Sequence, residues 1–492
     1  MATKEKTYLE LFTDADGPHK FYEVTVKGKQ LALRYGRRSG DQEQSSTETF
    51  KNFSTPAATK AAAEKKIQEK LRKGYQRAVP EGRPIPAVTR PKKTSTPKPA
   101  KQAPVMWKFA SKSRAFGIFI DGARCWIGNE KGHVYVLDHQ GEVLNQFRLP
   151  DGVKCIVGDD VWIYAGCNDG NVYDLTRRSP RLAYEIAKDV NVMWLDICDG
   201  ILTVSDEEGT VAAIDPEDQS LWKKNSNGDT GWMVRCDQRA VYHGHSGGVT
   251  TYALDGGKKL WHQQAVEGVL FGWQTADAVY VGTAVNKIHC LDKKRGKERA
   301  VYECDDQVFS CAVSADDRHV FAGDSDGWVY CFTAAGERLW KLKTGCGDAL
   351  SMQFWKDRVY IVTSKGDLAC IDATEEAIKA AQAGSLPKTR SIAAPKRAAA
   401  VPDTLETTTD PGEGVVVECF KEGSSLRMRV VSPGYHKTWH VQFPKDIRED
   451  GARYVVEGVR EASRGGFYRA HGEIQKLVAG DDPQPRRQSR RR

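Results

Sequence analysis

The sequence lacks long apolar segments and paired cysteines. None of its 492 residues fall in an apolar run of about 18 or more, the length of a membrane-spanning helix, which predicts no membrane partner. The opening residues, MATKEKTYLELF, have no apolar segment after their basic start, so we expect no secretory signal. The twelve cysteines contain no C-x-x-C pair. Because disulfide frameworks belong to oxidising compartments, a reduced, cytoplasmic protein is predicted.

Familiar catalytic motifs are also missing. There is no P-loop, no glycine-rich dinucleotide motif after a strand and no H-E-x-x-H zinc motif. His243 and His245 share one face of a predicted strand, but no cysteine or acid at ligand spacing completes a metal site. Asp324-Ser325-Asp326 begins like a calcium loop without its downstream glutamate, which favours a turn. We therefore predict a non-enzymatic protein with no catalytic residues, no cofactor and no metal.

Charge is distributed unevenly around a net value of +8. The central residues 105–376 carry 30 basic and 40 acidic side chains, which gives a net charge of −10. Positive charge is concentrated in residues 1–79 (+6), 80–104 (+5), 377–402 (+5) and 483–492 (+5). A polyanion is therefore expected to be attracted to the N-terminal segment, the linkers and the tail, and repelled on average by the centre.

A repeat of about 39 residues dominates the centre of the chain. Each copy has a short polar turn with glycine, an alternating apolar strand and a closing acidic or polar residue. The closing residues are Asp138, Thr176, Asp215, Asp255, Asp292, Thr333 and Asp372, which are 37 to 41 residues apart. Seven such copies predict a seven-bladed β-propeller of four-stranded blades over residues 105–376.

The ends of the repeat array indicate how the propeller closes. The last copy is followed by a helical pattern instead of a strand, whereas an additional strand, residues 105–109, precedes the first copy. This strand is similar to residues 339–342, which follow the sixth copy. We therefore predict that residues 105–109 complete the seventh blade and close the ring, which removes exposed sheet edges.

The repeat resembles the pyrroloquinoline-quinone-type β-propeller superfamily, through its G-x-x-x-G-x-V-x-x-L-D pattern and the Leu-Trp that follows several copies. Some members of that family are quinone-dependent dehydrogenases of the periplasm. The resemblance thus leaves a cofactor-dependent propeller enzyme as a second alternative, although this sequence lacks adjacent cysteines and a secretory signal. A protein-interaction scaffold is the simpler interpretation of the propeller, because fold alone does not supply function.

Residues 1–79 predict a small α+β module. Strands are predicted over residues 6–12, 20–26, 30–34 and 44–50 by their alternating patterns. A helix is predicted from Thr55-Pro56 to about Arg72, with an apolar stripe of Ala63, Ile67 and Leu71 and many lysines on the remainder.

This module resembles a WGR domain. The matching segments are residues 20–23 (KFYE), 35–40 (YGRRSG), Gln44 and 69–75 (EKLRKGY). In poly(ADP-ribose) polymerases, WGR domains contact DNA at strand breaks. The resemblance implies that Tyr35, which replaces the tryptophan of the motif, stacks on nucleic acid and that Arg37 contacts its backbone. The predicted nucleic-acid-binding residues are Tyr35, Arg34, Arg37, Arg38, Lys66, Lys70 and Lys73. The alternative is that Tyr35 packs internally and the arginines form a solvated edge.

The remaining segments are linkers, a small domain and a tail. Residues 80–104 are a basic, proline-rich linker, and residues 377–412 are predicted as a second linker. Residues 413–480 predict a small β-rich domain, and residues 481–492 predict a basic disordered tail. Aromatic and cationic side chains in the small domain predict a second surface for single strands or a peptide: Arg427, Arg429, Trp439, Arg464, Tyr468 and Arg469. Ordinary core aromatics are the alternative there.

Together these patterns predict a mainly β protein: a seven-bladed β-propeller between a WGR-like α+β module and a small β-rich domain. The favoured hypothesis is an adaptor whose N-terminal module binds DNA or RNA while the acidic propeller recruits a protein partner, in repair or defence. A protein-interaction scaffold that binds no nucleic acid is the first alternative.

Overall fold

The computed structural model describes most of the chain in two compact units, residues 1–96 and 97–492. The described residues are 4–11, 19–39, 42–73, 75–77, 102–159, 161–177, 179–186, 190–217, 219–226, 228–385, 387–395 and 405–478. The fold is mainly β, as predicted, with two α-helices among these residues. No described helix is long and apolar enough to cross a membrane.

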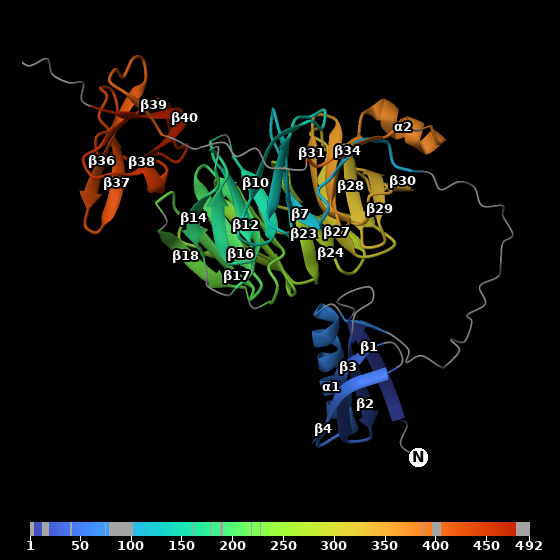
Figure 1. Ribbon diagram of the computed structural model, residues 1–492. Helices are drawn as coiled ribbons and strands as arrows, with labels where there is room; N and C mark the ends of the chain where they lie inside the picture. Colours follow the sequence, from blue (N-terminus) through green and yellow to red (C-terminus); the bar gives the residue numbers. More distant parts are fainter. Residues whose placement is uncertain are drawn as a thin grey trace, which may run out of the picture. The chain divides into compact units, whose positions relative to one another are not determined.

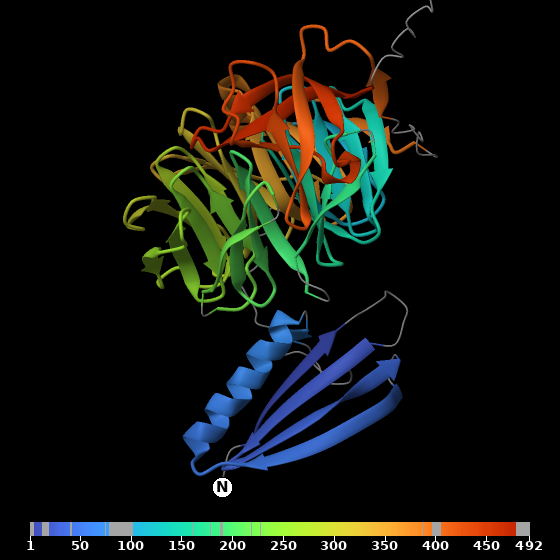
Figure 2. The same cartoon turned by 90° about the vertical axis from the view of Figure 1, so that its left-hand side faces the viewer.

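The N-terminal unit is a five-stranded antiparallel sheet with one helix on a single face (Figure 2). The strand order is β4-β3-β2-β1-β5. The elements are β1 (Lys4–Leu11), β2 (His19–Lys27), β3 (Gln30–Ser39), β4 (Gln42–Asn52), α1 (Pro56–Arg72) and β5 (Gln76–Arg77). The Thr55 side chain caps α1 by accepting a hydrogen bond from the Ala58 N–H. Ala63 and Ile67 are buried against the sheet, which confirms the predicted stripe.

The second unit contains seven sheets that form a propeller (Figure 1). Blades 1 and 2 consist of β7 (Ala115–Ile120), β8 (Cys125–Asn129), β9 (His133–Leu137), β10 (Val143–Arg148), β11 (Val153–Gly158), β12 (Ile163–Cys167), β13 (Asn171–Asp174) and β14 (Arg181–Glu185). Blades 3 and 4 consist of β15 (Val192–Cys198), β16 (Ile201–Asp206), β17 (Thr210–Ile214), β18 (Ser220–Asn225), β19 (Met233–Cys236), β20 (Ala240–His245), β21 (Gly248–Ala253) and β22 (Lys259–Gln263). Blades 5 and 6 consist of β23 (Val269–Gln274), β24 (Ala278–Thr283), β25 (Lys287–Asp292), β26 (Glu298–Glu303), β27 (Val308–Val313), β28 (His319–Asp324), β29 (Trp328–Thr333) and β30 (Arg338–Lys343).

Large rings from the outermost strands connect one blade to the next. The indole N–H of Trp222 donates to the Leu254 carbonyl, and that of Trp261 donates to the Lys293 carbonyl. In both pairs the acceptor lies 32 residues after the donor. In blades 3 and 4 the outer-strand ring therefore both fills apolar space and satisfies a backbone carbonyl of the following blade.

Blade 7 closes the ring with a strand from the start of this unit. Its sheet contains β31 (Ala349–Trp355), β32 (Arg358–Thr363), β33 (Asp367–Asp372), β6 (Val105–Ala110) and β34 (Arg390–Ala393). β6 pairs antiparallel with β33, which confirms the predicted closing strand. Trp107 of β6 is buried and donates its indole N–H to the His139 carbonyl of blade 1, again 32 residues on.

The segment after the propeller is more ordered than its predicted linker character. Within residues 377–412 lie the end of α2 (Glu375–Ala383), β34 and β35 (Glu406–Thr408). β34 pairs in parallel with β6, the outermost strand of blade 7. The free N–H and C=O groups of that edge provide the physical reason, because a passing chain segment can satisfy them.

The small β-rich domain is closed. Its strands are β36 (Val415–Glu422), β37 (Ser425–Val430), β38 (His440–Gln442), β39 (Arg453–Glu461) and β40 (Phe467–Leu477), with a short 3-10 helix, η1 (Lys445–Ile447). The sheet order is β35-β40-β38-β37-β36-β39, and β39 also pairs with β40. This last pairing returns the sheet to its second strand, so the domain is a small barrel around a core that includes Tyr454 and Val441.

We expect Trp107→Ala to lower the free energy of unfolding by about 3–5 kcal/mol, because it empties a packed site and removes the bond to blade 1. Urea unfolding of the full chain measures this loss. Leu221→Ala, on an exposed outer-strand side chain, is the control and should cost less than about 0.5 kcal/mol. Equal losses of unfolding free energy in the two variants would show that Trp107 of the closing strand contributes no more to stability than an exposed side chain does.

Candidate nucleic-acid interface

Three tyrosines and a lysine meet where α1 ends against the sheet. Tyr35 of β3 lies directly beside Tyr22 of β2, and their rings stack with centroids 5.7 Å apart. The Lys70 Nζ of α1 lies 4.4 Å from the centre of the Tyr22 ring and 5.3 Å from that of Tyr75. We name these four residues the Tyr35 cluster. Tyr35 is 40% exposed, so part of its ring is open to solvent while Tyr22 stacks against it.

Burial governs the charges of the Tyr35 cluster. Desolvation lowers the pKa of Lys70, and the neighbouring Lys73 lowers it further. Desolvation likewise raises the pKa of Tyr22, with a smaller contribution from the Glu69 carboxylate. A phosphate near Lys70 would relieve part of this cost, since an anion favours the charged ammonium. The cluster can therefore stack a base or sugar on Tyr35 and hold a phosphate at Lys70.

The other predicted binding residues of this module do not all join the cluster. Lys66 Nζ lies 2.6 Å from a Glu69 carboxylate oxygen, and Lys73 Nζ lies 3.5 Å from the other oxygen. Both lysines are therefore partly neutralised, although surface pairs of this kind are weak. Arg34 lies against Phe21, with its guanidinium carbon 5.6 Å from the ring centre. Because successive strand residues point to opposite faces, Arg34 and Tyr35 do not share a surface.

Arg37 and Arg38 lie in β3, but their side chains fall outside the described part of the structure. Their predicted roles remain predictions from the WGR resemblance. Tyr22 and Tyr75, in contrast, are cluster members that were not predicted to bind. Both belong to the segments that carry the resemblance, and the pairing of β2 with β3 was the signal that could have placed Tyr22 next to Tyr35.

The six residues predicted as a second binding surface are not gathered on one exposed face. Arg469 is 1% exposed, and its Nη2 lies 2.6 Å from the Asp159 carboxylate of the propeller. Arg464 pairs with Asp255 of the propeller. Tyr468 is buried in the barrel core, and Trp439 packs on it with ring centroids 5.1 Å apart. This part of the prediction is corrected, because these cations already meet acids of the same chain.

A buried carboxylate fixes the barrel to the propeller. Glu217, which follows β17, accepts hydrogen bonds from Arg427 and Arg448 of the barrel, both 2.7 Å from its Oε2. All three side chains are at least nine-tenths buried. Arg429, by comparison, pairs with Glu418 of the barrel on an exposed face. The acidity of the propeller is thus used partly to bind its neighbouring domain.

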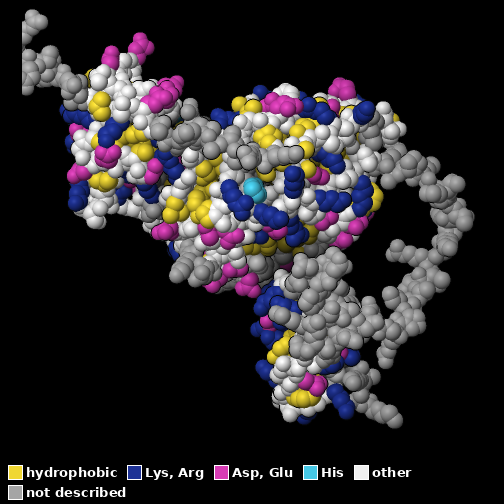
Figure 3. All heavy atoms as spheres, in the orientation of Figure 1, with side chains coloured by type: hydrophobic (Ala, Val, Ile, Leu, Met, Phe, Trp, Pro, Cys, Tyr) yellow, Lys and Arg dark blue, Asp and Glu magenta, His cyan; other side chains and the backbone are white. Residues whose placement is uncertain are grey.

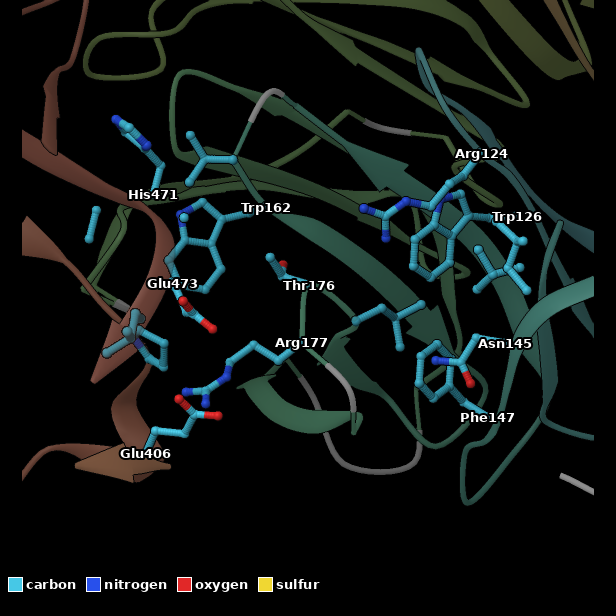
Figure 4. A pocket seen from close by; sticks show the side chains of 18 residues that line it. Arg124, Trp126, Asn145, Phe147, Trp162, Thr176, Arg177, Glu406, His471 and Glu473 are labelled. Carbon is cyan, nitrogen blue, oxygen red and sulfur yellow. The ribbon is translucent and has the colours of Figure 1, made fainter. Parts of the chain in front are cut away.

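A cavity of about 410 Å³ lies between blades 1 and 2 and the barrel (Figure 4). Its lining includes three large rings, Trp126, Phe147 and Trp162, with charged groups of both signs. The Trp162 indole N–H has no hydrogen-bond partner among the described residues. Propeller arginines and barrel carboxylates both line the space, so its electrostatics are mixed.

The described residues contain no cluster of three or more metal-binding side chains. His243 and His245 are buried near one another, and burial lowers their pKa values to about 3 and about 4. Ser246 and Ser325 each stand in a G-x-S-x-G sequence. Both lie in turns between two strands and not between a strand and a helix, so neither has the setting of a nucleophile elbow.

Two protein-family models match this sequence, one over the N-terminal domain and one over part of the propeller. Residues 5–82 match the WGR domain family, and residues 245–401 match a PQQ-type repeat family described as outer membrane protein assembly factor BamB. The two resemblances seen in the sequence are thereby confirmed. No curated protein matches the sequence.

Two solved structures are similar in fold. The WD40 β-propeller domain of Doa1 is 12% identical with a TM-score of 0.49, and the match covers 56% of this chain and 98% of that domain. The computationally designed Ika8 protein is 15% identical with a TM-score of 0.45, and the match covers 55% of this chain and 99% of Ika8.

We expect Glu217→Gln to destabilise the chain by about 3 kcal/mol, because it removes the buried carboxylate that two buried arginines share. Urea unfolding of the full chain measures the loss of stability. Limited proteolysis of the full chain measures whether residues 405–478 become easier to cleave. Glu418→Gln is a matched control, since Glu418 also accepts from two arginines, but these are exposed. It should cost less than about 1 kcal/mol. Similar costs in both variants would contradict a docking role for Glu217.

Proposed function

We propose that this chain is a non-enzymatic adaptor whose WGR domain binds DNA or RNA and whose propeller recruits a protein partner. The observation that carries the proposal is the Tyr35 cluster, a stacked and half-exposed ring with a partly desolvated ammonium beside it. Stacking on an aromatic ring tolerates any base, so recognition of strand ends or single strands, and not of sequence, is the activity that this surface supports.

The propeller's role in protein recruitment is supported by a repeated exposed leucine. Leu144, Leu182, Leu221 and Leu260 lie in the outermost strands of blades 1 to 4 and are 44–57% exposed. Scattered exposed leucines need no explanation, but here the same strand of four consecutive blades carries one. This repetition supports an apolar contact between the outer strands and a partner protein, although Leu144 also lines the cavity beside the barrel.

The proposal includes a reducing cytoplasm as the compartment in which the protein works. All twelve cysteines are free, and eleven of them are buried. Burial raises the pKa of thiols such as Cys155, to about 12, which keeps them protonated and unreactive. A reducing cytoplasm is the compartment in which such a set of thiols persists.

We expect Tyr35→Ala to weaken nucleic-acid binding roughly 10-fold or more, since loss of one stacking ring costs about 1–3 kcal/mol. Fluorescence anisotropy with nicked duplex, blunt duplex, single-stranded DNA and RNA at two salt concentrations measures this. Lys70→Met should also lower the slope of log K against log salt by about 1, because one phosphate contact is lost.

Phe50→Ala provides the matched control. Phe50 is an aromatic residue of the same sheet that is more exposed than Tyr35, at 58%, but it pairs with Ala32 and so lies on the face opposite Tyr35. Its removal should leave affinity unchanged. If the wild-type chain binds none of the four probes at low salt, nucleic acid is removed from the proposal and a protein scaffold remains.

A further inference from the structure

A second cavity, of about 430 Å³, lies where blade 7 meets blade 1. Ser111 and Lys112, which follow the closing strand β6, form one side of it, and Pro395, which follows β34, belongs to the same blade. The remaining lining residues come from blade 1, between Asn129 and Arg148. The cavity is therefore built at the seam that closes the propeller.

The lining of this cavity has one sign of charge. Its charged residues are Lys112, Lys131 and Arg148, which lie beside the imidazole of His133, and it includes no aspartate or glutamate. Among the residues that the structure describes, none of the three cations forms an ion pair. We name this site the basic pocket. Figure 3 shows dark blue side chains gathered around a histidine over the region of β10.

The basic pocket differs from the propeller that contains it. Residues 105–376 carry a net charge of −10, whereas residues 105–150 carry six lysines and arginines against four acids. Some cations of the outer strands are paired, as Arg338 and Lys341 are with Asp305. The basic pocket brings three cations without an ion pair among the described residues to one cavity whose lining has no carboxylate, and an external anion would complete this arrangement.

A buried asparagine organises the basic pocket. The Asn129 side chain is fully buried, and its Nδ2 donates to the Ser111 carbonyl at 3.1 Å. Its Oδ1 accepts from the backbone N–H groups of Lys131 and His133, at 3.0 and 3.1 Å. One side chain therefore joins the two loops that carry Lys112 and Lys131. The cations are brought together by the fold, which reduces the entropy lost when a ligand binds.

His133 supplies a neutral polar edge to the pocket. Arg148 Nη1 lies 3.3 Å from His133 Nε2, a distance at which the guanidinium donates and the imidazole accepts. Burial lowers the pKa of His133, and the positive charges of Arg148 and Lys131 lower it further. The imidazole is thus held neutral while the guanidinium keeps further N–H groups for a ligand.

We propose that the basic pocket binds a terminal phosphate monoester, carried either by a small molecule of nucleotide size or by the end of a nucleic acid. A phosphate monoester bears nearly two negative charges and several acceptor oxygens, which match two lysines and a guanidinium fork. A single carboxylate would leave most of the positive charge uncompensated. This site is separate from the Tyr35 cluster and does not depend on the nucleic-acid function proposed above.

Isothermal titration of the full chain at low salt tests the proposal with inorganic phosphate, adenosine 5′-monophosphate and adenosine. We expect the two phosphates to bind and adenosine not to bind. Lys131→Ala and Arg148→Ala should each weaken binding about 10-fold, as expected when a charged hydrogen-bond donor is lost. Both side chains are exposed, so the variants should fold, which circular dichroism checks. Arg148→Lys should retain part of the affinity because it keeps the charge.

The source of the phosphate is identified in a Tyr35→Ala background. Tighter binding of a 5′-phosphorylated oligonucleotide than of its unphosphorylated twin, abolished by Arg148→Ala, indicates a nucleic-acid end. Binding of the mononucleotide without this difference indicates a small ligand. Lys259→Ala, an exposed lysine of blade 4, controls for general charge. The proposal is overturned if neither phosphate binds, or if Lys259→Ala weakens binding as much as Arg148→Ala does.

Discussion

The pairing of β6 with β33 is the interaction on which the rest of the second unit depends. Blade 7 gains its fourth strand, and the ring of blades is complete, only when a strand from the start of the repeat array joins the last blade. Trp107 then occupies the role that Trp222 has between blades 3 and 4. The closing strand also provides the edge on which β34 pairs, and its continuation carries one side of the basic pocket.

Local pattern was sufficient to predict the blades and their closure. Each blade is a run of alternating strands separated by glycine turns, and both signals lie within one repeat. β6 could be placed because residues 105–109 are similar to residues 339–342 of β30. β34 could not, because a four-residue basic strand pairing in parallel carries no periodic signal of its own. Its pairing is decided by the edge it meets and not by its residues.

The candidate site was predictable to the extent that side-chain chemistry is local. Tyr35 and Lys70 were expected, and they lie in one cluster with Tyr22. Arg34 was grouped with Tyr35 because it is adjacent in sequence, although strand alternation puts it on the other face. The pairing of Arg469 could not be predicted from the sequence for a different reason. An aromatic-plus-cation segment has the same composition whether its anion is a phosphate or a distant aspartate, here Asp159.

Net charge by segment is a poor guide to where an anion can bind. The propeller total of −10 suggests repulsion of anions, yet the field of an exposed charge is screened within about 10 Å at ordinary ionic strength. What matters is the sign of the groups within that distance. Part of the propeller's acidity is internal, since Glu217 and Asp159 are neutralised by barrel arginines. When such pairs are left out of the charge count, the propeller surface is less acidic than the net charge of its sequence suggests. The charged residues that line the basic pocket, at the seam of blades 7 and 1, are all positive.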